Sequence, residues 1–274
     1  KNGGKQRLRH RLGKPFYWEE ADRMNLHWNR RKCFCLLAAA AILTTLAVVL
    51  HAAQKPVCKK LAEGTPAEAR LTILEGERPG PALFVVGGVH GDETAGWTAA
   101  DRLAKEARIL SGALYIVSPA NAWGAAHNNR LTAENRDLNR LFPGRLDGDA
   151  SEQLAAELFA EIEQAAPAVV FDLHESLPKR ANRDDLGSSI IFDSIDGIED
   201  LVLGMLLETQ SGSLCSGPFT CYTGAPIGSI NRVVNDALGL RVLTVETFRG
   251  DDLEKRVQDH LDLIHYTLRY YDME

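Results

Sequence analysis

Short apolar runs alternate with longer amphipathic segments along most of this chain, and this alternation restricts the folds that it can adopt. The runs have the length and composition of buried strands, and they cover residues 71–74, 82–86, 113–117, 168–173, 189–192 and 242–245. The amphipathic segments cover residues 94–109, 151–165, 198–211 and 252–271. Strands that alternate with helices form a sheet with helices on both faces. We therefore predict a three-layer α/β/α fold with a mixed, mostly parallel sheet.

The N-terminal region differs in composition from the rest of the chain. Residues 1–32 contain ten Lys or Arg against three Asp or Glu, whereas the whole chain of 274 residues has a net charge of −6. Residues 33–50, CFCLLAAAAILTTLAVVL, contain no charged side chain. Such a run is just long enough to cross a bilayer, and its positive flank stays in the cytoplasm. We predict a basic cytoplasmic arm at 1–32, a transmembrane signal-anchor at 33–53, a linker at 54–68 and one folded domain at 69–274.

This organisation predicts a single-pass protein of the cell membrane whose folded domain is extracytoplasmic. The alternative is a secreted protein with a cleaved signal peptide, but His51 stands where a cleavage site prefers a small residue. The negative net charge argues against nucleic acid as a partner. The expected partner of the N-terminal helix is the membrane. Cys215 and Cys221 would face an oxidising space, where both the bridged and the free state are open.

Side chains that bind metals or protons stand at the ends of several predicted strands. His90 and Glu93 lie in GGVHGDETAG after the strand at 82–86, His174 lies in FDLHES and Glu246 lies in TVETFRG. A His-x-x-Glu pair alone is also common in surface turns, but reactive groups of an α/β sheet gather where its strands end. Two His and one carboxylate form a common catalytic zinc site. We therefore expect one zinc ion at His90, Glu93 and His174.

The segment NNRLTAENRDLNRLFPG at 128–144 is rich in Arg and Asn. A solvated loop can have the same composition. However, Asn139 and Arg140 together can donate hydrogen bonds to a substrate carboxylate in fixed geometry. Asp137 can accept the free ring N–H of a metal-bound His, and Arg130 can polarise a carbonyl group under attack.

The blocks GGVHGDETAG, DLNRLFPG, FDLHES and TVETFRG resemble, in that order, those of the zinc carboxypeptidase clan. They are most similar to its succinylglutamate desuccinylase/aspartoacylase branch, and the resemblance covers residues 70–250. It implies a mixed sheet between helices and a zinc-dependent catalytic domain at 69–274. By position, it implies metal ligands at His90, Glu93 and His174, a carboxylate-binding pair at Asn139 and Arg140, an imidazole partner at Asp137, a general base at Glu246 and a carbonyl-polarising arginine at Arg130, with Arg136 as its rival.

The resemblance implies hydrolysis of an amide bond near a free carboxylate, with Glu246 as the base that activates water. The expected substrate is a small acylated amino acid, as for the deacylases of the branch. The alternative is a membrane-anchored metallocarboxypeptidase that acts on cell-wall or environmental peptides. Tyr222 in CYTGAPIGSIN would then contact the substrate, as a mobile Tyr does in the peptidases. A binding domain without catalysis is a third alternative, and the intact ligand and base positions argue against it.

Other polar residues receive no role in the site. Glu175 adjoins His174, but neighbouring side chains of a strand point to opposite faces, so we expect it to point away from the metal. His127, His260 and His265 have no partner pattern and are predicted to lie on the surface or on helix faces. The segment HLDLIHYTLRYYDME is predicted to form an amphipathic helix that packs on the sheet.

Overall fold

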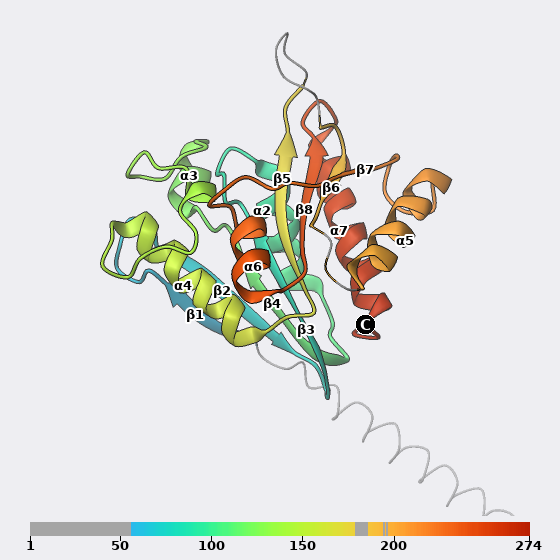
Figure 1. Ribbon diagram of the computed structural model, residues 1–274, viewed down its shortest axis with the longest axis horizontal. Coiled ribbons are helices and arrows are strands. Elements are labelled where there is room, and N and C mark those ends of the chain that lie inside the picture. Colours follow the sequence, from blue (N-terminus) through green and yellow to red (C-terminus); the bar gives the residue numbers. More distant parts are fainter. Residues whose placement is uncertain (1–55, 179–185, 194, 196) are drawn as a thin grey trace, which may run out of the picture. The chain divides into compact units, whose positions relative to one another are not determined.

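An eight-stranded mixed sheet forms the centre of the domain in the computed structural model, which describes residues 56–178, 186–193, 195 and 197–274. The strand order is β1-β2-β4-β3-β5-β8-β6-β7 (Figure 1). The strands are β1 (Val57–Leu61), β2 (Ala69–Glu75), β3 (Arg78–Gly87), β4 (Ser111–Val117), β5 (Val169–Ser176), β6 (Ser189–Ile191), β7 (Thr220–Tyr222) and β8 (Val242–Phe248). The central strands β4, β3, β5 and β8 are parallel, whereas β1, β2 and β6 introduce antiparallel pairs.

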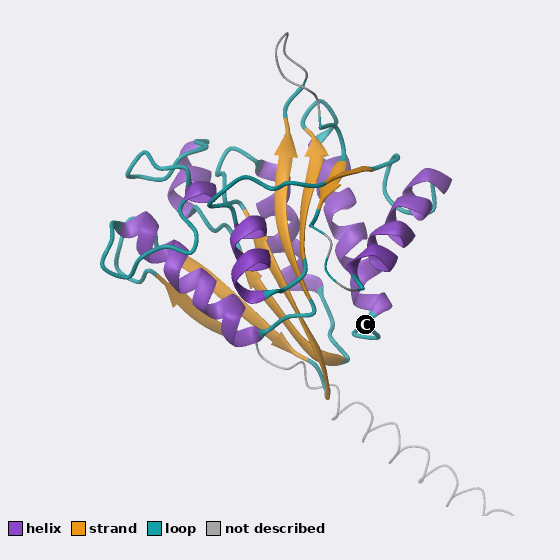
Figure 2. Cartoon of the chain, in the orientation of Figure 1, coloured by secondary structure: helices purple, strands orange, loops and turns teal. Residues whose placement is uncertain are grey.

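Helices cover both faces of this sheet (Figure 2). They are α2 (Thr94–Glu106), α3 (Ala122–His127), the short 3-10 helix η1 (Leu138–Arg140), α4 (Ala150–Ala165), α5 (Ile198–Ser211), α6 (Ile230–Leu238) and α7 (Leu253–Tyr270). Helices α2, α5 and α7 pack on one face through residues such as Leu103 and Leu263, and α4 and α6 pack on the other through residues such as Leu158 and Val234. The predicted three-layer fold class is therefore confirmed for this domain.

Strand β3 shows why the sequence contains continuous apolar runs. Its residues Leu83 and Val85 belong to the hydrophobic cluster on the α2 side, whereas Phe84 and Val86 belong to the cluster on the α4 side. All four side chains are fully buried, because both faces of the sheet are covered. Because β3, β5 and β8 are parallel, their carboxyl ends lie on the same side of the sheet. Loops can bring reactive side chains together there.

Residues 57–61 differ from the sequence prediction, which assigned them to a linker. They form the edge strand β1, which pairs antiparallel with β2 and places Val57 opposite Ile73. Four of its five residues are exposed. A charged, exposed edge strand lacks the alternating apolar pattern that predicts strands, because only its pairing with β2 defines it.

The predicted basic arm at 1–32 and the predicted transmembrane segment at 33–53 lie outside the described residues. Within the part of the chain that the structure does describe, none of the helices has both the length and the apolar character needed to span a bilayer. Cys215 and Cys221 are free thiols, so the bridged alternative is not formed.

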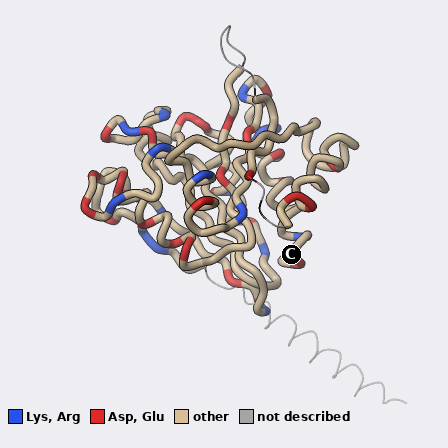
Figure 3. The backbone as a smooth tube through the Cα atoms, viewed as in Figure 1, with Lys and Arg blue, Asp and Glu red and all other residues tan. Residues whose placement is uncertain are grey.

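Basic and acidic residues are interspersed along the described backbone (Figure 3). Some of them pair between elements, as where both terminal nitrogens of Arg102 on α2 donate to the carboxylate of Glu254 on α7, at 2.7 Å and 3.0 Å. Exposed pairs of this kind contribute little to stability. The two hydrophobic clusters therefore hold the three layers together.

Candidate active site

The loop between β3 and α2 carries His90 and Glu93 and packs tightly against α3. Gly88 has a φ of +78°, a backbone conformation that glycine adopts without strain, and it turns the chain sharply after β3. A Cβ atom at Gly91 would lie 2.0 Å from the backbone carbonyl carbon of Gly124. The glycines therefore allow this turn to form, and it directs His90 and Glu93 into a cavity at the sheet edge.

The side chains of His90, Glu93 and His174 converge in this cavity. His90 Nδ1 lies 2.9 Å from Glu93 Oε1, His174 Nδ1 lies 2.7 Å from Glu93 Oε2, and the two Nδ1 atoms are 3.1 Å apart. All three side chains are buried. Zn–N distances of about 2.0–2.1 Å place tetrahedral ligand atoms roughly 3.3 Å apart. The donor types, burial and spacing of the three residues thus fit one zinc ion.

Acidic residues contact the outer ring nitrogens of both histidines. His90 Nε2 lies 3.1 Å from Asp137 Oδ1, and His174 Nε2 lies 3.0 Å from Asp172 Oδ1. Asp172 is fully buried, and its contact with His174 is an ion pair rather than a well-aligned hydrogen bond. Such partners keep a proton on Nε2 and leave Nδ1 free to bind a metal. Asp137 contacts a histidine ring nitrogen, as the sequence predicted. Asp172 had been given no role.

The charges of the three residues favour binding of a cation. Burial raises the pKa of Glu93, but His174 and His90 outweigh this effect and hold that pKa well below its ordinary value. Burial lowers the pKa of His174, yet Asp172 and Glu93 raise that pKa well above its ordinary value. A site in which carboxylates hold an imidazole proton can exchange that proton for a metal ion.

Glu246 lines the same cavity from β8. It is the register partner of His174 on the neighbouring strand β5, so both side chains point to the same face of the sheet. Burial raises the pKa of Glu246 to about 7, and the negative charges of Glu93 and Asp172 add to this effect. A carboxylate with a pKa near neutral pH can act as a general base.

Arginines line the cavity, whose volume is ≈ 340 Å³. Arg130 Nη1 donates to Glu93 Oε1 at 3.1 Å. Arg140 on η1 donates to the backbone oxygen of Asn139 at 2.7 Å, and no acidic side chain in the described part of the chain forms a salt bridge with it. The positive charge of Arg140 is therefore available to a substrate.

Two further candidates lie away from the ligand side chains. Arg136 contacts Asp149 at the start of α4, so Arg130 rather than Arg136 is the arginine beside Glu93. Tyr222 lies on the edge strand β7 with 40 % of its surface exposed, and the residues that line the cavity do not include it. The structure therefore gives Tyr222 no contact with the site.

Arg249 also lines the cavity, although the sequence did not single it out. Its Nη1 donates to Asp92 Oδ2 at 3.1 Å, and its Nε lies 3.4 Å from Glu175 Oε2. Glu175 contacts Arg256 of α7, yet it also lines the cavity that contains the ligands, so the prediction that it points away from the metal is not confirmed. A signal was present in the sequence, because Arg249 shares the block TVETFRG with Glu246.

The other described histidines do not join the site. His127 is exposed on α3, and His265 on α7 contacts Glu274 at 2.7 Å. His260 is fully buried and lies 3.2 Å from Thr247 Oγ1, and burial lowers its pKa to about 3. His260 thus lies on the buried face of helix α7, which is the second of the two predicted positions.

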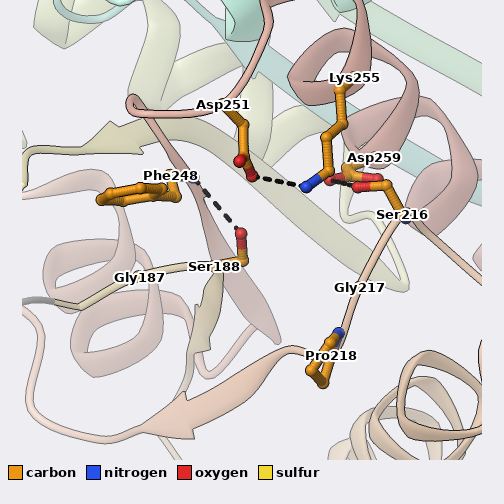
Figure 4. A pocket seen from close by; sticks show the side chains of 9 residues that line it. All are labelled: Gly187, Ser188, Ser216, Gly217, Pro218, Phe248, Asp251, Lys255 and Asp259. Carbon is orange, nitrogen blue, oxygen red and sulfur yellow. Dashed lines mark hydrogen bonds and ion pairs between the residues drawn. The ribbon is translucent and has the colours of Figure 1, made fainter.

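A second cavity of ≈ 290 Å³ lies between the end of β8, α7 and the loop after α5 (Figure 4). Lys255 pairs with Asp251 at 2.8 Å, and Asp259 accepts hydrogen bonds from the backbone nitrogen and the hydroxyl of Ser216, both at 2.7 Å. Burial raises the pKa of the nearby Cys215 thiol, which disfavours the metal-binding thiolate. The charged groups of this cavity are already partnered, so the cavity that contains His90, Glu93 and His174 is the candidate active site.

Residues 79–182 match the family described as the succinylglutamate desuccinylase/aspartoacylase catalytic domain. Over these residues the chain is similar to that catalytic domain. The matched segment contains His90, Glu93 and His174, together with Asp137 and the Asn139–Arg140 pair. Glu246 lies beyond it, and the sheet register brings this residue to the ligands.

Similar proteins come from several bacteria. The N-alpha-acetyl-L-2,4-diaminobutyric acid deacetylase of Halomonas elongata is 35 % identical over 98 residues, which make up 35 % of this chain and 28 % of the deacetylase. A succinylglutamate desuccinylase/aspartoacylase structure from Rhodobacter sphaeroides has a TM-score of 0.58 at 20 % identity and covers 80 % of this chain and 65 % of its own. Tripeptide-bound cell shape determinant Csd4 from Helicobacter pylori has a TM-score of 0.65 at 16 % identity and covers 75 % of this chain and 56 % of its own.

The chain thus spans less than two thirds of the length of each of these proteins. At these low identities the two solved structures establish the fold alone. The similarity to the family rests on residues 79–182.

Proposed function

We propose that this chain is a zinc-dependent hydrolase that cleaves an amide bond near a free carboxylate, with small acylated amino acids as its substrate class. The observation that carries the proposal is the convergence of His90, Glu93 and His174 beside Glu246 in one cavity. The family match of residues 79–182 and the sequence similarity to a deacetylase support it.

Each group of residues in the cavity has its own role in the proposed reaction. His90, Glu93 and His174 would hold the ion through two Nδ1 atoms and one carboxylate. Zinc bound there acidifies water and polarises a carbonyl oxygen. Glu246 accepts a proton from the attacking water and donates it to the leaving amine, and its pKa of about 7 suits both transfers. Arg130 stabilises the negative charge that develops on the carbonyl oxygen.

Arg140 supplies the positive charge that recognises the free carboxylate of the substrate. Its guanidinium lies at the cavity and is exposed, so it can reach a ligand. Asn139 is buried instead, and its side chain is fixed by Ile230, whose backbone nitrogen donates to Asn139 Oδ1 at 3.3 Å. Asn139 Nδ2 also lies 3.4 Å from His174 Nε2. Asn139 therefore shapes the cavity wall, and Arg140 makes the principal contact with the carboxylate.

The location of the protein forms part of the proposal. The basic arm at 1–32 and the uncharged run at 33–50 support a single-pass membrane protein with an extracytoplasmic domain. Secretion after signal cleavage is the alternative. Membrane fractionation, together with N-terminal sequencing of the mature protein, distinguishes the two.

A second candidate function is favoured by this predicted export. An extracytoplasmic hydrolase meets cell-wall and environmental peptides, which also end in a free carboxylate. The same zinc set, base and Arg140 can serve a metallocarboxypeptidase, because both reactions hydrolyse an amide bond next to a carboxylate.

The test is an assay of the zinc-loaded full chain against two substrate sets, N-acyl amino acids and short muropeptide-like peptides. Release of the acyl group supports the deacylase, and release of a terminal residue supports the carboxypeptidase. The His174→Ala variant is the control and should lose both activities. A zinc-loaded chain that hydrolyses neither set would contradict the proposed function.

A further inference from the structure

Arg249 links the strand that carries Glu246 to the turn that carries Glu93. It directly follows β8, and its backbone nitrogen donates to the backbone oxygen of Ser176 at the end of β5, at 2.9 Å. Its side chain extends to the β3–α2 loop, where Nη1 donates to Asp92 Oδ2 at 3.1 Å. One residue therefore connects the ends of the three strands that build the candidate active site.

The guanidinium of Arg249 is surrounded by carboxylates. Besides Asp92, Glu93 Oε1 lies 3.9 Å from Nη2 and Glu175 Oε2 lies 3.4 Å from Nε. Glu93 and Glu175 are buried, so an uncompensated negative charge there would be costly. Arg256 also contacts Glu175 and compensates part of its charge. Arg249 thus differs from Arg140, whose charge is free to meet a substrate.

We propose that Arg249 is a positioning residue, which fixes Asp92 and thereby the adjacent Glu93 in the orientation needed to bind the metal. The inference rests on the proposed function, because it takes the metal site to be His90, Glu93 and His174. The planar guanidinium is essential to this role, since Nη1 donates a hydrogen bond to Asp92 while Nε forms an ion pair with Glu175 without a hydrogen bond. A lysine ammonium keeps the charge but cannot hold both carboxylates in fixed geometry.

The experiment measures the zinc affinity of the metal-stripped full chain by competition with a chelator. Arg249→Lys and Arg249→Met should both weaken zinc binding about 10–100-fold, as residues that orient metal ligands do when they are replaced. The matched control is Arg232→Met, which removes an exposed arginine on α6 whose Nε donates to Asp236 at 2.6 Å. Its zinc affinity should equal that of the wild type. The absorption spectrum of bound Co²⁺ should change in Arg249→Lys and remain unchanged in the control.

The outcomes separate this inference from the proposed function. A wild-type chain that binds one zinc ion, with unchanged affinity in both Arg249 variants, overturns the positioning role. An affinity kept by Arg249→Lys and lost only by Arg249→Met also overturns it, because charge alone then suffices. An increase in KM without a change in zinc affinity assigns Arg249 to substrate binding and overturns it as well. A wild-type chain that binds no zinc contradicts the proposed function and this inference with it.

A second variant keeps the test decisive if Arg249→Met fails to fold. Asp92→Asn leaves Arg249 and Glu175 in place and removes only the charge that Arg249 holds at the turn. If Arg249 acts through Asp92, the loss of zinc affinity in the Asp92→Asn, Arg249→Lys double variant should be clearly smaller than the product of the two single losses. Fully multiplicative losses would overturn the proposal.

Discussion

His174 and Glu246 are register partners on the adjacent parallel strands β5 and β8. A proposed metal ligand and the proposed base therefore point to the same face of the sheet, and neither depends on a loop for its position. Strands buried on both faces hold such side chains more precisely than loops do. The turn after β3 that carries His90 and Glu93 completes the site.

The Glu246→Gln variant should keep one zinc ion per chain and lose most of its turnover. The amide has the size of the carboxylate but cannot accept the proton of water, and general bases contribute typically about 10²–10⁴-fold to the rate. The measurement is kcat on the substrate that the wild type hydrolyses, together with the zinc content of the same sample. Surviving turnover would show that another group is the base.

The same substitution should stabilise the metal-free protein at alkaline pH. The folded state raises the pKa of Glu246 from 4.5 to about 7, so it binds this proton more tightly than the unfolded state does. Stability is therefore lost as pH rises through this range, and a neutral Gln avoids that loss. Denaturant unfolding at pH 8 should show a gain of about 1–3 kcal/mol for Glu246→Gln. Equal stability of the two proteins at pH 8 would contradict the raised pKa.

Activity should fall as pH falls below about 7, because Glu246 must be a carboxylate to accept a proton. A bound cation offsets part of the raised pKa, so the midpoint of the acid limb of kcat/KM is expected between 4.5 and about 7. Zinc content is measured at each pH, since protonation of His174 competes with the metal. An acid limb centred below 4.5 with full zinc occupancy would contradict the assignment.

The Arg140→Ala variant should bind carboxylate-bearing substrates weakly while its kcat changes little. Hydrogen bonds to charged groups contribute about 1.5–3 kcal/mol, so KM should rise about 10–100-fold. Arg140→Lys should recover part of the loss. The kinetics of a substrate amide that lacks the carboxylate serve as the control and should not change between wild type and variant. An unchanged KM on the carboxylate substrate would remove Arg140 from the site.

The Gly91→Ala variant should disrupt the ligand turn. The added Cβ atom would lie 2.0 Å from the carbonyl carbon of Gly124 and 2.2 Å from the backbone nitrogen of Ala125, so the turn must move away from α3. We expect a loss of about 1–3 kcal/mol in the free energy of unfolding and weaker zinc binding. Gly217→Ala is the matched control, because a Cβ atom added there would have no described atom within 4 Å. Equal stability of the two variants would show that the turn tolerates a side chain.

The sequence predicted those elements whose pattern is local. The strands β3, β5 and β8 each contain a short apolar run, and the long helices α2, α4 and α7 show helical spacing, so each could be identified from its own residues. The edge strands β1 and β7 could not, since their residues are mostly exposed and only pairing with a neighbour defines them. The short helices α3 and α6 were missed because six and nine residues are fewer than the roughly 11–18 residues over which helical periodicity is recognised.

The candidate site shows the same division. The roles of four residues could be predicted from the sequence, because their blocks resemble a family pattern: His90, Glu93, His174 and Glu246. The choice between Arg130 and Arg136 required the structure, because both lie in one polar loop and only the fold directs one of them to Glu93. The contact of Arg249 with Asp92 joins residues 157 positions apart, which no local pattern reveals.

The central claim is that hydrolysis depends on one metal ion held by His90, Glu93 and His174. The most direct measurement is the rate of N-acyl amino acid hydrolysis by the metal-stripped full chain as Zn²⁺ is added stepwise. The account predicts a rate that rises from near zero, saturates at one equivalent per chain and does not recover in His174→Ala. A rate that is unaffected by metal removal, or that His174→Ala regains in full, would contradict it.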